Sequence, residues 1–239
     1  MAAPFADYFD LQLRLAAAMA ERTGAPLREA ISLYTNLGRR LGLFDKTDPE
    51  WLAYLDGLEA ASDRLAWTMA VFGRLTGERV APGQTVFGCF ACEAPGEDGT
   101  LRIHFQNREL GQALSPLSAA RIGARMSDLR AMFGFIQRDY PTARQVKGGS
   151  WLYNLEAYRR LFPPEYGASR LPAEEPIRLG GTSTWGQMVD HRGLVRPEAR
   201  TRFLGALEAL DVERPWLAFP LRTQITTAPV AAFFDFYGL

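Results

Sequence analysis

Two arginines stand one helical turn apart at the start of the longest predicted helix. Ser118 precedes this helix, and Arg121 and Arg125 follow on one face. The dipole of a helix disfavours cations at its start, whereas the N–H groups that the first turn leaves unpaired attract anions. Ser118, Arg121 and Arg125 would therefore suit a phosphate or pyrophosphate. In the alternative interpretation, both arginines pair with Glu109 or Asp128, and no ligand is involved.

Two other side chains could transfer protons. His104 lies on the polar face of an alternating segment, together with Arg102, and an imidazole titrates near neutral pH. Tyr153 and Ser150 follow a glycine pair, Gly148-Gly149, where a ligand can approach the backbone closely. A phenol with a pKa of about 10 can also donate a proton. The alternatives are a hydrogen-bonded surface histidine and a packed core strand.

The cysteines are a weaker candidate for a site. Cys89 and Cys92 have the spacing of half a structural zinc site, but the sequence contains no second pair. Residues three apart on a strand face opposite sides, so both thiols would need a turn to converge. We expect two buried structural cysteines and no metal.

Composition restricts the class of protein. The chain has 239 residues, is 47% hydrophobic and 23% charged, and has a formal net charge of zero. These values are typical of a folded globular protein and give no general attraction to nucleic acid or to an anionic membrane. No segment approaches the roughly 20 apolar residues that cross a bilayer, and no signal peptide is visible at the N-terminus. We expect a cytoplasmic protein with a small-molecule substrate.

The elements that must position these residues form two groups, and we predict a mixed α/β (α+β) protein. Apolar residues recur at helical spacing through residues 1–79, which we expect to form a helical module. From residue 80 onward, the pattern changes to strands alternating with helices, and we expect one α/β unit over residues 80–239. The predicted elements of this unit are a hairpin of 85–93 with 101–106, helices over 116–139, 154–162 and 197–210, strands over 144–153 and 217–227, and a terminal helix from Pro229.

Helix boundaries in the first module follow local signals. Gly24 and Gly42 should end helices, and residues 27–41 should form one helix. Asp48, followed by proline, should cap the third helix, and Ser62 the fourth. Residues 165–183 are rich in proline, glycine and serine, and we expect a long loop there.

The order of these segments resembles the second half of the GNAT-type acyltransferases, and more narrowly of those that carry a helical N-terminal domain. The usual Gln/Arg-x-x-Gly-x-Gly/Ala signature is changed here, because Ala120 precedes Gly123 and Arg125 follows it. The resemblance would cover residues 80–239. It rests on the order of Ile103-His104, the helix from Pro116, Ser150-Trp151-Leu152, Leu161-Phe162-Pro163 and Phe219-Pro220-Leu221-Arg222-Thr223.

The resemblance implies an acyl-CoA-dependent acyltransferase that acts on a small-molecule or peptide amine. Acyl-CoA would be the co-substrate, held by Ser118, Arg121, Arg125 and Ser150. His104 would deprotonate the acceptor amine, and Tyr153 would protonate the leaving thiolate.

Two other functions remain open from the sequence. The same scaffold could bind a small ligand or a partner without catalysis, and the aromatic end at 233–237 could form a homodimer surface. A different enzyme could be built on the polar loop at 185–192. Asp190 and His191 are adjacent there, however, so they do not form a ready-made catalytic pair.

Overall fold

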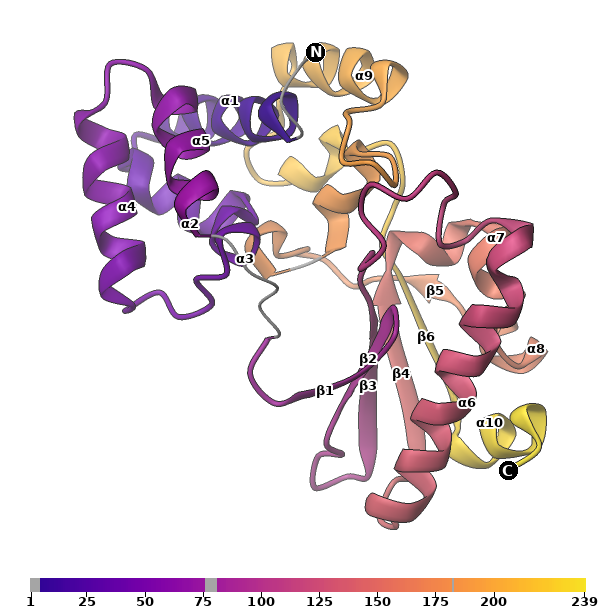
Figure 1. Ribbon diagram of the computed structural model, residues 1–239. Coiled ribbons are helices and arrows are strands. Elements are labelled where there is room, and N and C mark those ends of the chain that lie inside the picture. Colours follow the sequence, from indigo (N-terminus) through magenta and orange to yellow (C-terminus); the bar gives the residue numbers. More distant parts are fainter. Residues whose placement is uncertain (1–4, 76–80, 182) are drawn as a thin grey trace. The chain divides into compact units, whose positions relative to one another are not determined.

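The computed structural model describes residues 5–75, 81–181 and 183–239 (Figure 1). These residues form a mixed α/β protein with one six-stranded sheet, which confirms the predicted fold class. No helix in these three ranges is both long enough and apolar enough to span a membrane.

The chain divides into two compact units, each made of two segments. The helical unit comprises residues 1–81 with 174–220, and the sheet unit comprises residues 82–173 with 221–239. The predicted boundary after residue 79 lies outside the described residues. Segment 174–220 differs from the prediction, because it groups with the N-terminal helices in one compact unit.

Helices and short 3-10 turns fill the helical unit. The first segment contains α1 (Ala6–Thr23), α2 (Leu27–Tyr34), α3 (Leu37–Leu41), α4 (Pro49–Ala60) and α5 (Arg64–Arg74). The second segment contains η3 (Leu179–Gly181), η4 (Ser183–Met188), α9 (Pro197–Glu208) and η5 (Pro215–Ala218).

Local signals set the ends of several of these helices. Gly24 has a φ of 73°, a left-handed conformation that glycine adopts at little cost, and α1 ends there as predicted. The carboxylate of Asp48 accepts a 2.8 Å hydrogen bond from the N–H two residues on, which confirms it as the cap of α4. The cap of α5 is Asp63, not the predicted Ser62, because the Asp63 carboxylate accepts from the N–H of Ala66 at 2.9 Å.

The predicted helix over 27–41 is wrong in one respect, because the structure breaks it into α2 and α3. The hydroxyl of Thr35 donates a 2.6 Å hydrogen bond to the carbonyl of Ile31, and the N–H of Asn36 donates to Gln12 Oε1 at 2.8 Å. The bond to Gln12 satisfies the N–H of Asn36, which a continuous helix would have paired with the carbonyl four residues earlier. The predicted end at Gly42, with a φ of 75°, is confirmed.

Trp185 explains why segment 174–220 belongs to the helical unit. Its indole is fully buried and donates a 2.9 Å hydrogen bond to the carbonyl of Tyr34. Its ring lies edge-on to those of Phe203 and Phe219, with centroids 5.4 and 4.8 Å away, and also contacts Tyr8. Burying so large an aromatic side chain stabilises the unit by about 1.5–3 kcal/mol.

The sheet of the second unit has the strand order β1-β2-β3-β4-β6-β5. Neighbouring strands are antiparallel except β3 and β4, which run parallel and are connected through the long helix α6 (Figure 1). The strands are β1 (Gln84–Phe87), β2 (Phe90–Glu93), β3 (Thr100–Phe105), β4 (Gln145–Ser150), β5 (Leu171–Pro172) and β6 (Gln224–Pro229). The helices and turns are η1 (Ala119–Arg121), α6 (Ile122–Asp139), η2 (Trp151–Asn154), α7 (Glu156–Arg159), α8 (Pro164–Ala168) and α10 (Val230–Tyr237).

One face of this sheet is apolar and forms the core of the unit. Leu101, Ile103 and Val146 are buried there together with residues of α6 and α10. Phe133 of α6 stacks on Phe233 of α10, with ring centroids 4.5 Å apart. Because side chains alternate along a strand, the opposite face carries the intervening polar residues. Three of these are Arg102, His104 and Lys147.

Several elements of the sheet unit differ from their prediction. The predicted strand over 85–93 is a hairpin of β1 and β2, because Gly88 turns the chain with a φ of 55°. The α-helical part of the predicted helix from Pro116 begins only at Ile122, after the 3-10 turn η1. The predicted loop over 165–183 contains α8 and the short edge strand β5.

Candidate functional site

The two parallel strands at the centre of the sheet separate at their carboxyl ends. Their last register pair is Arg102 with Lys147. Beyond it, residues 103–105 of β3 pair with β2, and residues 148–150 of β4 pair with β6. Within the described residues, no register pair joins β3 to β4 after that point. We call this point the end of the β3–β4 ladder. Ligands of open α/β sheets bind beyond the carboxyl ends of parallel strands.

Gly148 lies directly after the ladder end and has close neighbours on the core side. A β-carbon at this position would collide with the hydroxyl groups of Tyr153 and Tyr166. The two hydroxyl oxygens are 2.8 Å apart in a hydrogen bond, and both tyrosines are buried. The glycine therefore lets β4 lie against a pair of buried phenols.

His104 lies on the separated part of β3, on the polar face of the sheet. Its Nε2 atom is 2.7 Å from Glu93 Oε1, and each side chain is 37% exposed. Glu93 also accepts a long hydrogen bond of 3.4 Å from Gln84 Nε2. A carboxylate beside an imidazole orients the ring and stabilises the imidazolium that forms when it takes up a proton. This pair is therefore suited to general-base chemistry.

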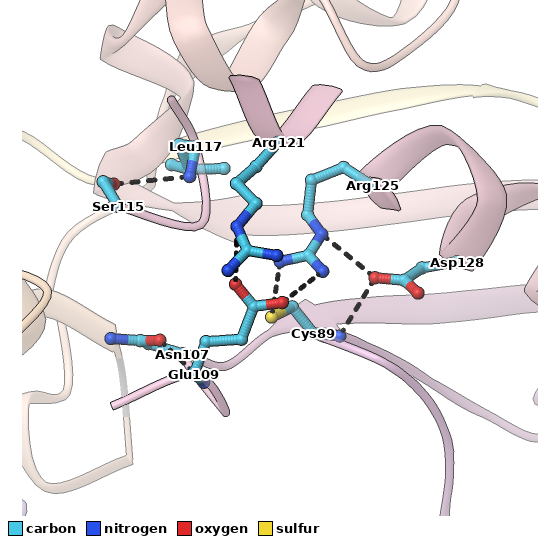
Figure 2. A network of polar contacts seen from close by, with 8 residues as sticks. All are labelled: Cys89, Asn107, Glu109, Ser115, Leu117, Arg121, Arg125 and Asp128. Carbon is cyan, nitrogen blue, oxygen red and sulfur yellow. Dashed lines mark hydrogen bonds and ion pairs between the residues drawn. The ribbon is translucent and has the colours of Figure 1, made fainter. Parts of the chain in front are cut away.

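Arg125 does not face a ligand site, contrary to the phosphate prediction. Its side chain is only 4% exposed and donates to Glu109 Oε1 at 2.7 Å, and its Nε atom is 3.0 Å from Asp128 Oδ2 (Figure 2). It also contacts Cys89 Sγ at 2.9 Å. The alternative interpretation, in which the arginines pair with Glu109 or Asp128, is therefore confirmed for Arg125. Its charge is compensated inside the protein, so we do not assign it to phosphate.

Arg121 and Ser118 have different surroundings from Arg125. The Arg121 side chain is 34% exposed, and its Nε atom is 3.8 Å from Glu109 Oε2, a distance that makes a weak ion pair (Figure 2). Ser118 precedes the 3-10 turn η1, and its hydroxyl makes no capping hydrogen bond to that turn. Both residues thus remain at the start of the helix, where a phosphate was predicted, but a ligand would meet Arg121 without Arg125.

The other two predicted site residues have structural partners. Ser150 is buried, and its hydroxyl accepts a 3.1 Å hydrogen bond from the N–H of Leu152, which begins η2. Tyr153 is 1% exposed, and burial raises its pKa well above the usual value, with the contact to Tyr166 adding to the shift. A buried phenol that does not ionise readily is unsuited to exchange protons with a substrate. We leave Tyr153 out of the proposed chemistry.

The cysteines lie at the turn of the first hairpin and in β2. Both thiols are free and buried. Burial raises the pKa of Cys89, and it raises that of Cys92 to about 11. In the part of the chain that the structure describes, no group of three or more histidine, cysteine or acidic side chains is arranged to hold a metal.

Sequence reasoning found His104 but missed Glu93. Glu93 is 11 residues away along the chain, and only the register of β2 with β3 brings the two together. Strand alternation could have found their shared face once the hairpin was placed correctly. No family model, curated protein or solved structure matches the chain.

Proposed function

We propose that this protein is an acyl-CoA-dependent N-acyltransferase built on a GNAT-like scaffold. The order of elements that suggested the resemblance is present: a hairpin, a helix, a parallel strand, short helices and a last strand. The observation that carries the proposal is the separation of β3 from β4 next to His104 and Glu93. An opening between parallel strands would offer backbone groups to an extended ligand, and the histidine is at its border.

The reaction needs one proton acceptor and an activated acyl group. A thioester supplies a carbonyl carbon that amines attack readily. His104 would take a proton from the acceptor's ammonium group, with Glu93 stabilising the imidazolium. The amine nitrogen then forms a bond to the carbonyl carbon as the C–S bond breaks, and the nitrogen releases its second proton to solvent. The coenzyme leaves as a thiolate, which solvent can protonate, because a free thiol has a pKa of about 8.5.

The phosphates of the donor would lie at the start of η1. Ser118 and Arg121 are the residues we assign there, since Arg121 is partly exposed and has only one distant carboxylate as a partner among the described residues. Arg125 would act indirectly, by fixing the segment around Glu109 against α6. The proposal therefore uses four of the described side chains: Ser118 and Arg121 for the donor, and His104 and Glu93 for the acceptor.

The first test is ligand-induced stabilisation. Thermal unfolding is followed with acetyl-CoA, longer acyl-CoAs, free CoA, ATP and NAD. A ligand that binds only the folded protein stabilises it by about 2.7 kcal/mol at a hundred times its dissociation constant. We expect the acyl-CoAs to raise the midpoint temperature and ATP and NAD to leave it unchanged. An unchanged midpoint with every CoA compound would sink the proposal and favour a non-catalytic binding protein on the same scaffold.

The second test separates binding from catalysis. Release of the CoA thiol from acetyl-CoA is measured with a panel of amines for the wild type, His104→Gln and Glu93→Gln. Loss of a general base costs about a hundredfold or more in kcat. Both variants should still be stabilised by acetyl-CoA. The matched control is His191→Gln, which changes the only other histidine and belongs to the helical unit. Equal turnover in His104→Gln and the control would exclude the assigned role.

A further inference from the structure

Two cations face each other across the last register pair of the β3–β4 ladder. Arg102 and Lys147 are Cα partners, and partners in a ladder project their side chains on the same face. Arg102 is exposed, and Lys147 is partly buried. Lys147 is also one of only two lysines in the chain, the other being Lys46. The pair therefore concentrates positive charge at the point where β3 and β4 separate.

The charge of this pair is only partly compensated by the described part of the protein, because Asp98 attracts Lys147 electrostatically without an ion-pair contact. No ion pair or side-chain hydrogen bond joins either head group to a carboxylate of a described residue. The acidic neighbours are already engaged: Glu93 contacts His104, and the Asp98 carboxylate accepts from the N–H and the hydroxyl of Thr100 at 2.9 and 3.0 Å. Like charges opposite each other in a sheet destabilise it. An anionic ligand would convert this repulsion into attraction.

The pair lies on the same face as the proposed base. His104 follows Arg102 by two residues on β3, so the two Cα atoms are about 7 Å apart along the strand. Both side chains point to the same side of the sheet. A molecule with an amine and a carboxylate separated by a few bonds could therefore place the amine at His104 and the carboxylate between the cations. Arginine suits this role because its planar head group binds a carboxylate through two parallel hydrogen bonds.

We propose that Arg102 and Lys147 bind the carboxylate of the acyl acceptor, which makes the substrate an amino acid or a related amine with a carboxylate group. This inference rests on the proposed acyltransferase function, and it narrows the acceptor from amines in general to amines that carry a carboxylate. A simple cationic amine would be repelled by the same two side chains.

The experiment compares amino acids with counterparts that lack the carboxylate. The probes are the common L-amino acids and the corresponding C-terminal amides, with acetyl-CoA as donor. The proteins are the wild type, Arg102→Gln, Lys147→Gln, the double variant, and the charge-retaining Arg102→Lys and Lys147→Arg. The matched control is Arg202→Gln, which removes one charge from an exposed arginine of α9 in the helical unit. Thiol release gives kcat and KM, and thermal unfolding reports binding without turnover.

We expect acids to be better acceptors than their amides in the wild type. Each neutralised cation should raise KM for the best acid about ten- to a hundredfold, the value of one charge-assisted contact. kcat and the KM for acetyl-CoA should change little, and turnover of the amides should not fall in the variants. Arg102→Lys and Lys147→Arg should recover a large part of the loss, and Arg202→Gln should match the wild type.

Three outcomes would overturn the inference. Acids and amides that perform alike would remove the need for a carboxylate site. A double variant that loses affinity for acetyl-CoA instead of the acceptor would assign the cations to a donor phosphate. Probes that neither turn over nor stabilise the protein would exclude amino-acid acceptors.

The inference and the proposed function can also fail separately. If acyl-CoAs do not bind, but amino acids stabilise the wild type and not the double variant, the acyltransferase proposal fails while the carboxylate site stands. If acyl-CoAs bind and amino acids are acylated with the same KM in the wild type and the double variant, the function stands and the carboxylate site fails.

Discussion

Arg125 Nη2 lies 2.7 Å from Glu109 Oε1, and this contact connects the segment after β3 to the second turn of α6. The same guanidinium contacts Asp128 and the thiol of Cys89, so one buried cation joins three parts of the chain that are distant in sequence (Figure 2). Removing one member of such a buried group leaves the opposite charge uncompensated inside the protein, and this lowers stability.

We predict that Arg125→Ala lowers the free energy of unfolding by about 3–5 kcal/mol, because it leaves Asp128 without its cation and Glu109 with only the distant Arg121. Arg121→Ala is the matched control, one helical turn away and 34% exposed, and should change it by less than about 1 kcal/mol. Urea denaturation of both variants measures the difference. Similar losses would mean that Arg125 is not a structural ion-pair partner.

The stability of the sheet unit should depend on acid through Glu109. The hydrogen bond from Arg125 lowers the pKa of Glu109 below its ordinary value, against an opposing effect of burial. A carboxyl group whose pKa is lower in the folded protein contributes its full stabilisation at a pH above its pKa in the unfolded chain. This contribution is lost as the pH falls through its pKa in the folded protein. Unfolding free energies of the wild type and Glu109→Gln, measured from pH 6 to pH 3, should therefore converge on acidification. Parallel curves would contradict the assignment.

The glycine pair of β4 offers a test of packing at the ladder end. Gly148→Ala should destabilise the protein by about 1–3 kcal/mol or more, because the methyl group meets two buried tyrosine hydroxyls. Gly149→Ala is its natural control, since its β-carbon would be 3.1 Å from Ile225 Cδ1, the movable end of a side chain. Thermal denaturation of both variants decides the matter, and an equal loss would argue against close packing at Gly148.

Tyr153→Phe distinguishes a structural phenol from a catalytic one. Removing this hydroxyl leaves the buried Tyr166 hydroxyl without that partner, which should cost about 1–3 kcal/mol of stability. The double change with Tyr166→Phe should cost less than the sum of the single changes, because neither polar group is left behind. If the proposed enzyme is active, kcat should change little in Tyr153→Phe. A stable variant with greatly reduced kcat would restore Tyr153 as the proton donor.

The thiol of Cys92 should be unreactive in the folded protein. Its pKa is raised to about 11, chiefly by burial, so at pH 8 only about a thousandth of it is thiolate. Iodoacetamide should label neither cysteine in native buffer and both in urea, with mass spectrometry as the readout. Rapid native labelling of Cys92 would show that β2 opens readily.

Local sequence signals predicted much of the fold, and they did so where a backbone group and its partner are close in sequence. Asp48 and Gly24 act within one helical turn of themselves, so their type and position were enough. The turn at Gly88 was missed because an aromatic run with one glycine also suits a continuous strand. The break at Thr35 was missed because the N–H of Asn36 bonds to Gln12, which is 24 residues away.

The candidate site was less predictable for the same physical reason. The sequence pointed to His104 by its residue type, but its partner Glu93 depends on the register of two strands. Arg125 was noticed for its place at a helix start, yet its function follows from a carboxylate 16 residues earlier and a thiol 36 residues earlier. The point at which the β3–β4 pairing ends could not be predicted, since it depends on the register of two strands that are far apart in sequence.

Each unit is made of two segments of the chain, so neither unit is complete until its second segment has been synthesised. β6 lies between β4 and β5 in the sheet, yet it is synthesised after all the other strands. Until residues 224–229 leave the ribosome, the edge of β4 has no partner, and an unpaired strand edge is a template for association with other chains. The core of the helical unit is likewise incomplete until Trp185 has been synthesised. Nascent chains of this protein should therefore depend on chaperones until residues 224–229 emerge.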